Sequence, residues 1–263
     1  VDALNADFGN RSKNASMLSD VYGIMPAINL AIKNVKKWNK IEKKSSNFPF
    51  GLLGAKSYIK YEPLGTVGMI SPWNFPVILT LRPLITALAA GNKVVVKPSE
   101  HTPNTSNAIK TVVEAALGPS VVEVILGGPD VAAKLTAQSF DHICFTGGTQ
   151  IGKLVMKAAA EQLISVTLEL GGKSPVIIDL TARLKGAAKK IAWGKYLNAG
   201  QVCIAPDYLL VEEAISEEFA ERFEENIHEM FGPSPIDSED LGKIVNKHHY
   251  NRILKLIKDA VKD

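Results

Sequence analysis

The fold is decided by residues 67–97, which read VGMISPWNFPVILTLRPLITALAAGNKVVVK. The short apolar run at 67–71 is typical of a buried strand, and the longer run at 77–90 predicts a helix that ends at Gly91. Residues 93–97 form a second strand-like run, which Pro98 closes. A strand, a helix and a second strand in this order form a crossover unit whose two strands run parallel.

The same alternation continues to residue 161. Helices are predicted at 105–117, 129–137 and 149–161, and strands at 121–126 and 142–145. Helices that connect parallel strands cover both faces of the sheet. The sequence therefore predicts an α/β fold with a doubly wound, Rossmann-like parallel sheet.

The pattern changes after residue 165. Strands are predicted at 165–170, 175–180 and 207–211, and helices at 182–197 and 243–261. A further helix is predicted to begin after Ser216, which would be its N-cap. We predict that residues 1–170 form one domain and that residues 171–263 form the first, incomplete part of a second α/β domain.

The first 63 residues precede the sheet. Residues 1–38 are predicted to be helical, and residues 40–46 to be a polar connector. Residues 55–63 partly alternate between apolar and polar side chains, which predicts one arm of an antiparallel hairpin.

The composition is that of an ordinary soluble globular chain, with 263 residues, 46% hydrophobic and 22% charged. The 30 Lys and Arg against 27 Asp and Glu give a net charge of only +3, which argues against a nucleic-acid partner. No apolar run reaches the roughly 18 residues that a membrane span needs. Two cysteines cannot form a disulfide framework, so we expect a reducing compartment and a cytoplasmic location.

A glycine-rich segment, GGTQIG at 147–152, lies between a predicted strand and a predicted helix. It is not the GxGxxG motif, because its second glycine comes one residue early. Its backbone N–H groups can nevertheless face an anion at the start of the helix, although a plain turn is the alternative. The adjacent His248 and His249 diverge on a helix, and no other His or Cys cluster occurs, so the sequence predicts no metal site.

Three residues carry candidate chemistry. Cys203 lies in the connection NAGQVCIAP at 198–206, where it is better placed to react than Cys144 inside a strand, although core packing is its alternative. Glu169 ends an apolar run, where desolvation suits a carboxylate to act as a general base near neutrality. Asn74, on a turn between two prolines, offers an amide donor for an oxyanion, unless it only forms the turn.

Five motifs, three of which contain these residues, follow one another along the chain. They are PWNFP at 72–76, KPSE at 97–100, FTGG at 145–148 with Gly152, LELGGK at 168–173, and GQVC at 200–203. Together they resemble the aldehyde dehydrogenase superfamily. The stretches ADFGNRS at 6–12 and CIAPDY at 203–208 resemble its class-3 branch, which includes the coniferyl-aldehyde dehydrogenases.

The resemblance implies a role for each site residue. Cys203 is the nucleophile that attacks the aldehyde, Asn74 holds the oxyanion, and Glu169 activates the water that releases the acid. Lys97 and Glu100 hold the adenosine ribose, and NAD is expected over NADP because a carboxylate there disfavours a 2′-phosphate. The further cofactor contacts are Trp73, Gly147, Gly148 and Gly152.

The resemblance also implies a longer parent chain. Family members carry a Glu-x-Phe cofactor motif far downstream of the cysteine, and Glu229-Met-Phe231 follows Cys203 much too soon to be that motif. We therefore expect residues 1–170 to be the NAD-binding domain and residues 171–263 the first part of the catalytic domain. The parent is expected to be a homodimer, with the hairpin near 55–63 at its interface.

Three functions stay open at this point. The leading one is oxidation of an aldehyde, either aromatic such as coniferyl aldehyde or aliphatic, to the carboxylic acid with NAD(P). A thiol esterase that needs no cofactor is the second, because it requires only Cys203 and Glu169. The third is a catalytically silent NAD-binding fragment.

Overall fold

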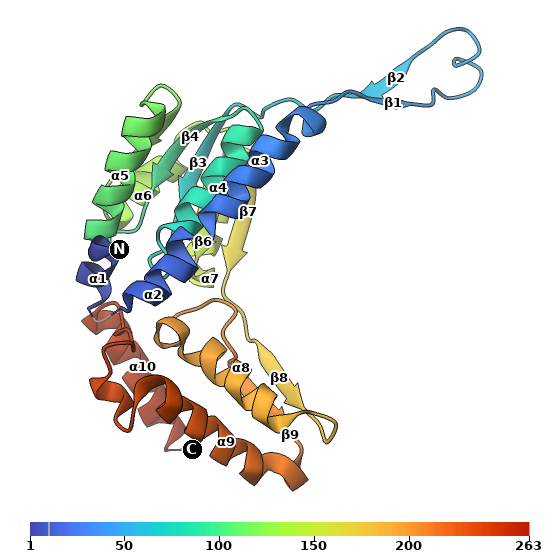
Figure 1. Ribbon diagram of the computed structural model, residues 1–263. Coiled ribbons are helices and arrows are strands. Elements are labelled where there is room, and N and C mark those ends of the chain that lie inside the picture. The colour runs from blue at the N-terminus through green and yellow to red at the C-terminus, as the bar shows by residue number, and fades with distance from the viewer. Residues whose placement is uncertain (10, 263) are drawn as a thin grey trace.

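The computed structural model describes residues 1–9 and 11–262, and it divides into two lobes from which a thin arm projects (Figure 1). The first lobe holds a five-stranded sheet, and the second holds a two-stranded sheet with its own helices. Asn10 of the ADFGNRS motif and Asp263 of the predicted second domain lie outside the described residues.

The five-stranded sheet is parallel throughout. Its strands are β3 (Thr66–Ile70), β4 (Lys93–Lys97), β5 (Val122–Val124), β6 (His142–Gly147) and β7 (Ser165–Leu170), in the spatial order β5-β4-β3-β6-β7. The chain builds outward from β3 to β5 on one side and then returns to add β6 and β7 on the other. The predicted doubly wound parallel sheet is thus confirmed, and the order reverses between β3 and β6.

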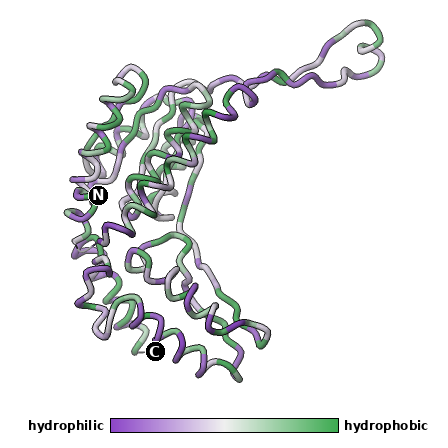
Figure 2. The backbone as a smooth tube through the Cα atoms, in the orientation of Figure 1, coloured by the Kyte–Doolittle hydropathy of each residue, from purple (hydrophilic) through white to green (hydrophobic). Residues whose placement is uncertain are grey.

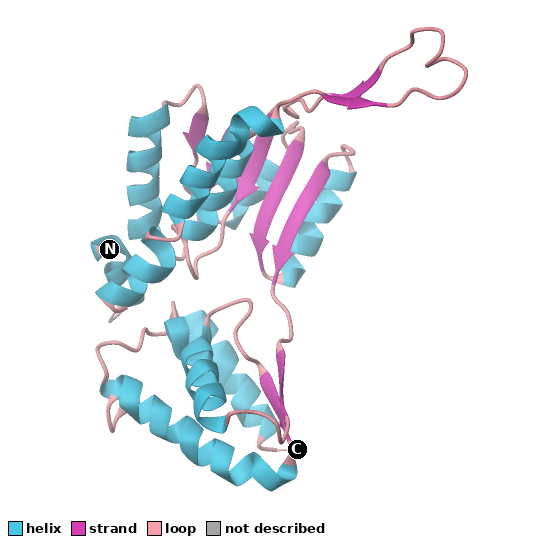
Figure 3. Cartoon of the chain, turned by 45° about the vertical axis from the view of Figure 1, so that its right-hand side comes forward, coloured by secondary structure: helices cyan, strands magenta, loops and turns pink. Residues whose placement is uncertain are grey.

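Helices cover both faces of this sheet (Figure 3). The covering helices are α4 (Ile78–Ala89) and α5 (Pro103–Leu117) on one face, and α6 (Pro129–Thr136) and α7 (Thr149–Ala160) on the other. Alternate strand residues supply the two cores: Met69 and Val96 face α4 and α5, and Ile143 and Phe145 face α6 and α7. This alternation is the expected consequence of the pleat of a strand.

The N-terminal segment packs against the outside of the first lobe. It contains α1 (Asp2–Phe8), α2 (Lys13–Ser16), the π-helical turn η1 (Met17–Val21) and α3 (Ile24–Trp38). The helical run Lys13–Trp38 is long and apolar enough to cross a membrane by length and composition. Its Asp20, however, is fully buried in the folded lobe and binds the start of α4, which α3 contacts along its length.

The projecting arm is an antiparallel hairpin in which β1 (Glu42–Lys44) pairs with β2 (Ser57–Ile59). The prediction of a hairpin arm near 55–63 agrees with β2, but its partner strand lies in the segment predicted to be a connector. The connector prediction was wrong because β1 is exposed on both faces, so Glu-Lys-Lys carries no hydrophobic signal. In Figure 2 hydrophilic residues dominate the stalk of the arm, and hydrophobic ones reappear towards its tip. Phe48 and Leu52, in the loop between the two strands, are exposed.

The second lobe is built around two parallel strands. They are β8 (Pro175–Ile178) and β9 (Tyr208–Val211). The connection between them contains α8 (Leu184–Tyr196) and the 3₁₀ turn η2 (Leu197–Gly200). After β9 come α9 (Glu213–Phe231), the 3₁₀ turn η3 (Pro235–Asp237) and α10 (Lys247–Ala260). Helices α8 and α9 pack on one face of the pair, through Ile178, Ala188 and Phe219. The change from the first sheet to the second falls between β7 and β8, close to the predicted boundary at residue 170.

The predicted N-cap Ser216 is wrong. Helix α9 begins at Glu213, directly after β9, and Ser216 lies within its first turn, where its hydroxyl donates to the carbonyl of Glu213. The helix starts early because the backbone N–H of Glu212 already bonds to the last residue of β8, Ile178, which leaves no linker between strand and helix.

Candidate active site

The turn after β3 is joined to the loop that carries Cys203. The Asn74 side-chain Nδ2 donates to the carbonyl oxygen of Gln201 at 2.9 Å, and the Asn198 Nδ2 donates to the carbonyl oxygen of Asn74 at 2.9 Å. These reciprocal bonds connect the first lobe to the second. They bring two of the predicted site residues, Asn74 and Cys203, to the same place.

The loop before Cys203 has an uncommon backbone. Asn198, Ala199 and Gly200 all have positive φ, at 51°, 54° and 77°, a conformation that only glycine adopts freely. Asn tolerates it, and the Asn198 bond to Asn74 helps to hold it. Gln201 adds a second tie, because its Nε2 donates to the carbonyl of Lys243 and its Oε1 accepts from Val245 N–H. The loop thereby presents the Cys203 thiol, which is free and exposed.

Glu169 is placed differently from the prediction. It lies on β7 opposite Thr146 of β6, and its side chain is exposed. The burial predicted for this carboxylate is therefore absent, because β7 is an edge strand and the core under α4 and α5 does not extend to it. Within the described residues no hydrogen bond joins Glu169 to Cys203 or to Asn74. Burial, together with the negative charge of Glu169, raises the pKa of the neighbouring Cys144 thiol.

A buried cation and a surface carboxylate mark the end of β4. The Lys97 side chain is 2% exposed, and its Nζ donates to Glu100 Oε2 at 2.8 Å and to the carbonyl of Pro98 at 3.2 Å. Partial burial alone would raise the pKa of Glu100, but the hydrogen bond and charge of Lys97, together with a backbone hydrogen bond and His101, outweigh it, and the pKa lies below its ordinary value. The pair sits at the carboxyl end of the strand.

The glycine segment after β6 leaves open space in front of α7. A Cβ at Gly148, the N-cap of α7, would meet no atom within 4 Å, and no side chain caps this helix start. At Gly152 a Cβ would come within 2.7 Å of Leu170 Cδ2, so this glycine lets α7 pack closely on β7. A Cβ at Gly147 would likewise lie only 2.5 Å from the Phe145 ring, so this position also has no room for a side chain. The first N–H groups of α7, which no side chain caps, thus face solvent at the point where the strand order of the sheet reverses.

These residues fit a dinucleotide. Open parallel sheets bind such ligands at the carboxyl ends of strands beside the point where the order reverses, which here lies between Trp73 after β3 and Gly148 after β6. A helix start without a side chain suits a pyrophosphate, and an exposed carboxylate such as Glu100 suits ribose hydroxyls.

Helix α10 reaches this edge as well. The His249 ring lies 5.0 Å from the Trp73 ring and 5.7 Å from the His101 ring, centroid to centroid. Burial lowers the pKa of His249, and so do the positive charges of Arg252, His101 and His248. Across residues 1–9 and 11–262, no group of three His, Cys, Asp or Glu side chains is arranged to hold a metal ion.

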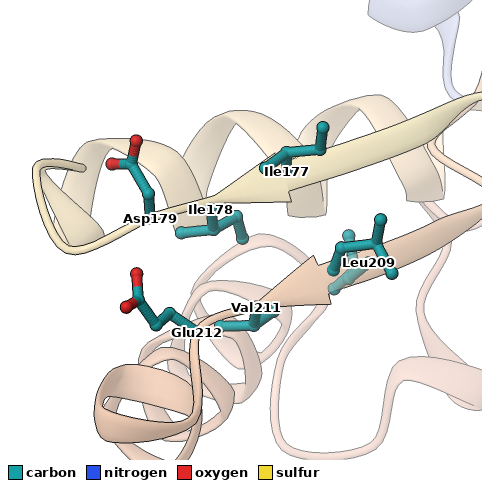
Figure 4. Close-up of a pocket in the computed structure, with 7 residues that line it drawn as sticks. Ile177, Ile178, Asp179, Leu209, Val211 and Glu212 are labelled. Carbon is teal, nitrogen blue, oxygen red and sulfur yellow. The ribbon is translucent and has the colours of Figure 1, made fainter.

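An apolar groove of about 680 Å³ lies beside Cys203. Val202 and Ile204, its two neighbours, line the groove together with Trp193, Leu197 and Met230. A second hollow lies at the opposite, carboxyl end of β8 and β9, where Figure 4 shows Asp179 and Glu212 beyond the strand ends. Cys203 precedes the amino end of β9, so the groove, which its two neighbours line, is the hollow on its side of the lobe.

Sequence reasoning gave no role to Arg11, Asp20, Asn198 or Gln201. Arg11 Nη1 donates to the Asn74 carbonyl at 3.2 Å, and its guanidinium is paired with Asp20 at 2.5 Å. The one available signal was the Asn198 and Gly200 pair, because both residues favour a left-handed backbone. The other contacts join segments far apart in the sequence, where no local pattern applies.

The sequence profile of the aldehyde dehydrogenase family matches residues 6–263. The coniferyl aldehyde dehydrogenase of a Pseudomonas species is 40% identical over 260 residues, which are 99% of this chain and 53% of that protein. The 4,4'-diaponeurosporen-aldehyde dehydrogenase of Staphylococcus aureus is 42% identical over 99% of this chain and 56% of its own length. A protein of the dog named "aldehyde dehydrogenase, dimeric NADP-preferring" is 38% identical over 97% of this chain and 54% of its own length. The chain spans about half the length of these curated relatives.

Solved structures give the same result. A substrate-bound state of Staphylococcus aureus AldH superposes with a TM-score of 0.92 at 40% identity, over 100% of this chain and 57% of that one. A Mycobacterium tuberculosis aldehyde dehydrogenase complexed with NAD+ superposes with a TM-score of 0.87 at 28% identity, over 99% and 53%.

Proposed function

The chain belongs to the aldehyde dehydrogenase family, and we propose that the protein oxidises an aldehyde to its carboxylic acid with a nicotinamide cofactor. The observation that carries the proposal is the bond from the Asn74 amide to the backbone of the Cys203 loop. It brings an exposed thiol and a fixed amide donor together. A primary amide has two N–H hydrogens, so Asn74 keeps one for an oxyanion after bonding to Gln201.

The chemistry begins at Cys203. Its thiolate forms a bond to the carbonyl carbon, and the carbonyl oxygen becomes an oxyanion that the Asn74 amide stabilises. When bound, the nicotinamide supplies the acceptor for the hydride that the oxidation removes. The thioester that remains on Cys203 is released when Glu169 takes a proton from water and the water oxygen bonds to the acyl carbon. The carbon–sulfur bond then breaks, which yields the acid and the free thiolate.

Four features support a nicotinamide dinucleotide as the cofactor. They are the buried Lys97, the Glu100 carboxylate beside it, the uncapped start of α7 at Gly148, and the position of Trp73 at the point where strand order reverses. We propose NAD in preference to NADP, because the Glu100 carboxylate would face the 2′-phosphate of NADP. Replacement of Glu100 by Gln should reduce the preference for NAD over NADP.

The groove beside Cys203 favours an apolar aldehyde. Its lining is mainly apolar, with Trp193, Leu197 and Ile204 among the walls, while Lys189 and Lys190 contribute its charged part. Two relatives are named as dehydrogenases of coniferyl aldehyde and of 4,4'-diaponeurosporen-aldehyde. We therefore propose aromatic or long aliphatic aldehydes as the substrate class.

The projecting arm supports a homodimer. Its loop exposes Phe48, Leu52 and Leu53, each with about four-fifths of its surface in contact with solvent. Such a cluster on a thin arm is more often covered by a second protein surface than left in water. The two free cysteines agree with a reducing, cytoplasmic location, which is also part of the proposal.

The decisive experiment follows NADH formation by absorbance with benzaldehyde, coniferyl aldehyde and hexanal. It compares this chain with a chain extended to the length of the relatives, each also as Cys203→Ala and Glu169→Gln. We expect both substitutions to abolish turnover. Cys203→Ala should in addition abolish the hydrolysis of an activated ester, which needs no cofactor.

Two outcomes would contradict the proposal. If the extended chain binds NAD but oxidises none of the three aldehydes, the protein is a silent binding module. If it hydrolyses the activated ester through Cys203 and forms no NADH, the protein is a thiol esterase.

A further inference from the structure

A buried ion pair lies next to the proposed oxyanion donor. Arg11 and Asp20 are 4% and 0% exposed, and Arg11 Nη2 donates to Asp20 Oδ2 at 2.5 Å. Burial raises the pKa of Asp20 and lowers that of Arg11, while their mutual attraction opposes both changes. Burying an ion pair away from water is costly unless its other polar atoms are also hydrogen-bonded. The partners of those atoms identify the segment that the pair holds in place.

Both members of the pair bind the same turn. Asp20 Oδ1 accepts from the N–H groups of Val77 and Ile78, at 3.1 and 3.2 Å, where α4 begins. Arg11 Nη1 donates to the carbonyl of Asn74, at 3.2 Å. The Phe75 ring, between these two points, lies with its centroid 5.0 Å from the guanidinium carbon. The turn from Asn74 to Ile78 is thus held at its start, middle and end by one ion pair.

The Asn74 peptide is the point where this pair meets the second lobe. Its carbonyl oxygen accepts from Arg11 on one side and from Asn198 Nδ2, at 2.9 Å, on the other. Fixing that carbonyl fixes the peptide plane, and with it the direction of the Asn74 side chain. The same side chain donates to Gln201, two residues before Cys203.

We propose that Arg11, held by Asp20, is a positioning residue that orients the Asn74 amide towards the oxyanion formed at Cys203. This inference rests on the function proposed above. The orientation of the amide matters because a hydrogen-bond donor displaced by about 1 Å from the developing charge loses much of its catalytic effect. Arg11 touches neither substrate nor thiol, and it acts only through Asn74.

A double-mutant cycle in the dehydrogenase-active protein tests the proposal. Arg11→Lys keeps a charge for Asp20, but a lysine cannot reach two acceptors in the fixed geometry of a guanidinium. We expect kcat to fall about tenfold while KM changes less than about twofold. Asn74→Ala should lower kcat on the order of 100-fold or more. If Arg11 acts through Asn74, the double variant is no slower than Asn74→Ala alone.

A second variant keeps the test independent of folding defects. Arg11→Met with Asp20→Asn removes both charges together, and the amide oxygen of the replacement for Asp20 still accepts from the start of α4. It should lose as much kcat as Arg11→Lys and show the same lack of additivity with Asn74→Ala. Lys110→Met is the matched control, because Lys110 also bonds a carboxylate and a backbone carbonyl, Glu114 and Val124, but beside the edge strand β5, two strands away from β3. Its kcat should stay within about twofold of the parent.

The outcomes separate this inference from the proposed function. If the losses from Arg11→Lys and Asn74→Ala multiply, or if neither variant at Arg11 lowers kcat, Arg11 is only structural and the inference is overturned. If Asn74→Ala and Cys203→Ala both retain full turnover, the proposed mechanism itself is wrong, whatever Arg11 does.

Discussion

The two lobes differ in how completely their sheets are covered. The five-stranded sheet has helices on both faces, and its central residues Met69 and Val96 are at most 1% exposed. The two-stranded sheet has helices on one face only, and on it Ile177 is 76% exposed and Leu210 53%. The first lobe therefore contains a complete core of its own. The second leaves apolar strand residues in water, which a stable domain rarely does with a parallel sheet.

The candidate site lies where these unequal lobes meet. Asn74 belongs to the complete lobe and Cys203 to the partly covered one, and the contacts between them are polar bonds through Asn198 and Gln201. The precision of the site depends on those bonds, and on Arg11 behind them, more than on an apolar interface. Four predictions test this contrast between the lobes.

The largest effect should come from a charge placed in each sheet. Val96→Asp buries a carboxylate with no partner and should cost more than about 4 kcal/mol in the free energy of unfolding, so that the chain no longer folds cooperatively. Ile177→Asp, on the open face of β8, should cost less than about 0.5 kcal/mol in this chain. Urea denaturation followed by circular dichroism measures both. Equal losses would mean that the open face is covered in solution.

Ion pairs should show the next largest difference. Arg11→Met leaves Asp20 buried and unpaired and should cost about 3–5 kcal/mol. In the second lobe Arg222 pairs with Glu218 on the surface of α9, and Arg222→Met should cost less than about 1 kcal/mol. The same denaturation experiment, repeated in 1 M salt, provides the check. The Arg222 effect should fall with salt and the Arg11 effect should not, because burial shields the pair from counterions.

Two glycines in helices should give effects of opposite sign. Gly152→Ala in α7 forces a Cβ to 2.7 Å from Leu170 and should cost about 1–3 kcal/mol. Gly186→Ala in α8 meets nothing within 4 Å, and should stabilise the helix by about 0.5 kcal/mol. Thermal melts of the two variants measure the difference. A stabilising Gly152→Ala would mean that α7 does not pack closely on β7.

Much of the first lobe could be predicted from the sequence, because its strands and helices are buried and their periodicity is strong. The strand at 93–97 was predicted with the bounds that the structure has, and the helix at 149–161 ends one residue early. Exposed elements were harder. Residues 42–44 form a strand without an apolar side chain, and Glu169 was predicted to be buried because its apolar neighbours do not reveal that β7 is covered on one face only.

The candidate site could be predicted only as a set of residue types. Cys203 and Asn74 stand in recognisable local settings, a glycine-containing connection and a turn between prolines. The contacts that join them involve Asn198, Gln201 and Arg11, and these depend on how distant segments pack. No spacing in the sequence encodes such a contact, and the roles of the predicted site residues stay predictions until the variants are measured.

The smallest effect concerns pH and the contact between the lobes at Trp73. Since burial and the neighbouring Arg252, His101 and His248 lower the pKa of His249, this histidine binds a proton less readily in the folded protein than in the unfolded chain. The contact between His249 and Trp73 should therefore be intact above the ordinary histidine pKa of 6.5, and should weaken as the pH falls below it. The test is the emission maximum of Trp73 between pH 8 and pH 5, with Trp38 and Trp193 replaced by Phe.

We expect the Trp73 emission to shift to longer wavelength as the pH falls, because α10 moves away and water reaches the indole. His249→Gln should remove the pH dependence. His248→Gln is the matched control and should keep the pH dependence, because His248 is exposed and the ring in contact with Trp73 is that of its neighbour, His249. An emission maximum that shifts with pH in the His249→Gln variant would show that another group controls this contact, and that the charge of His249 does not.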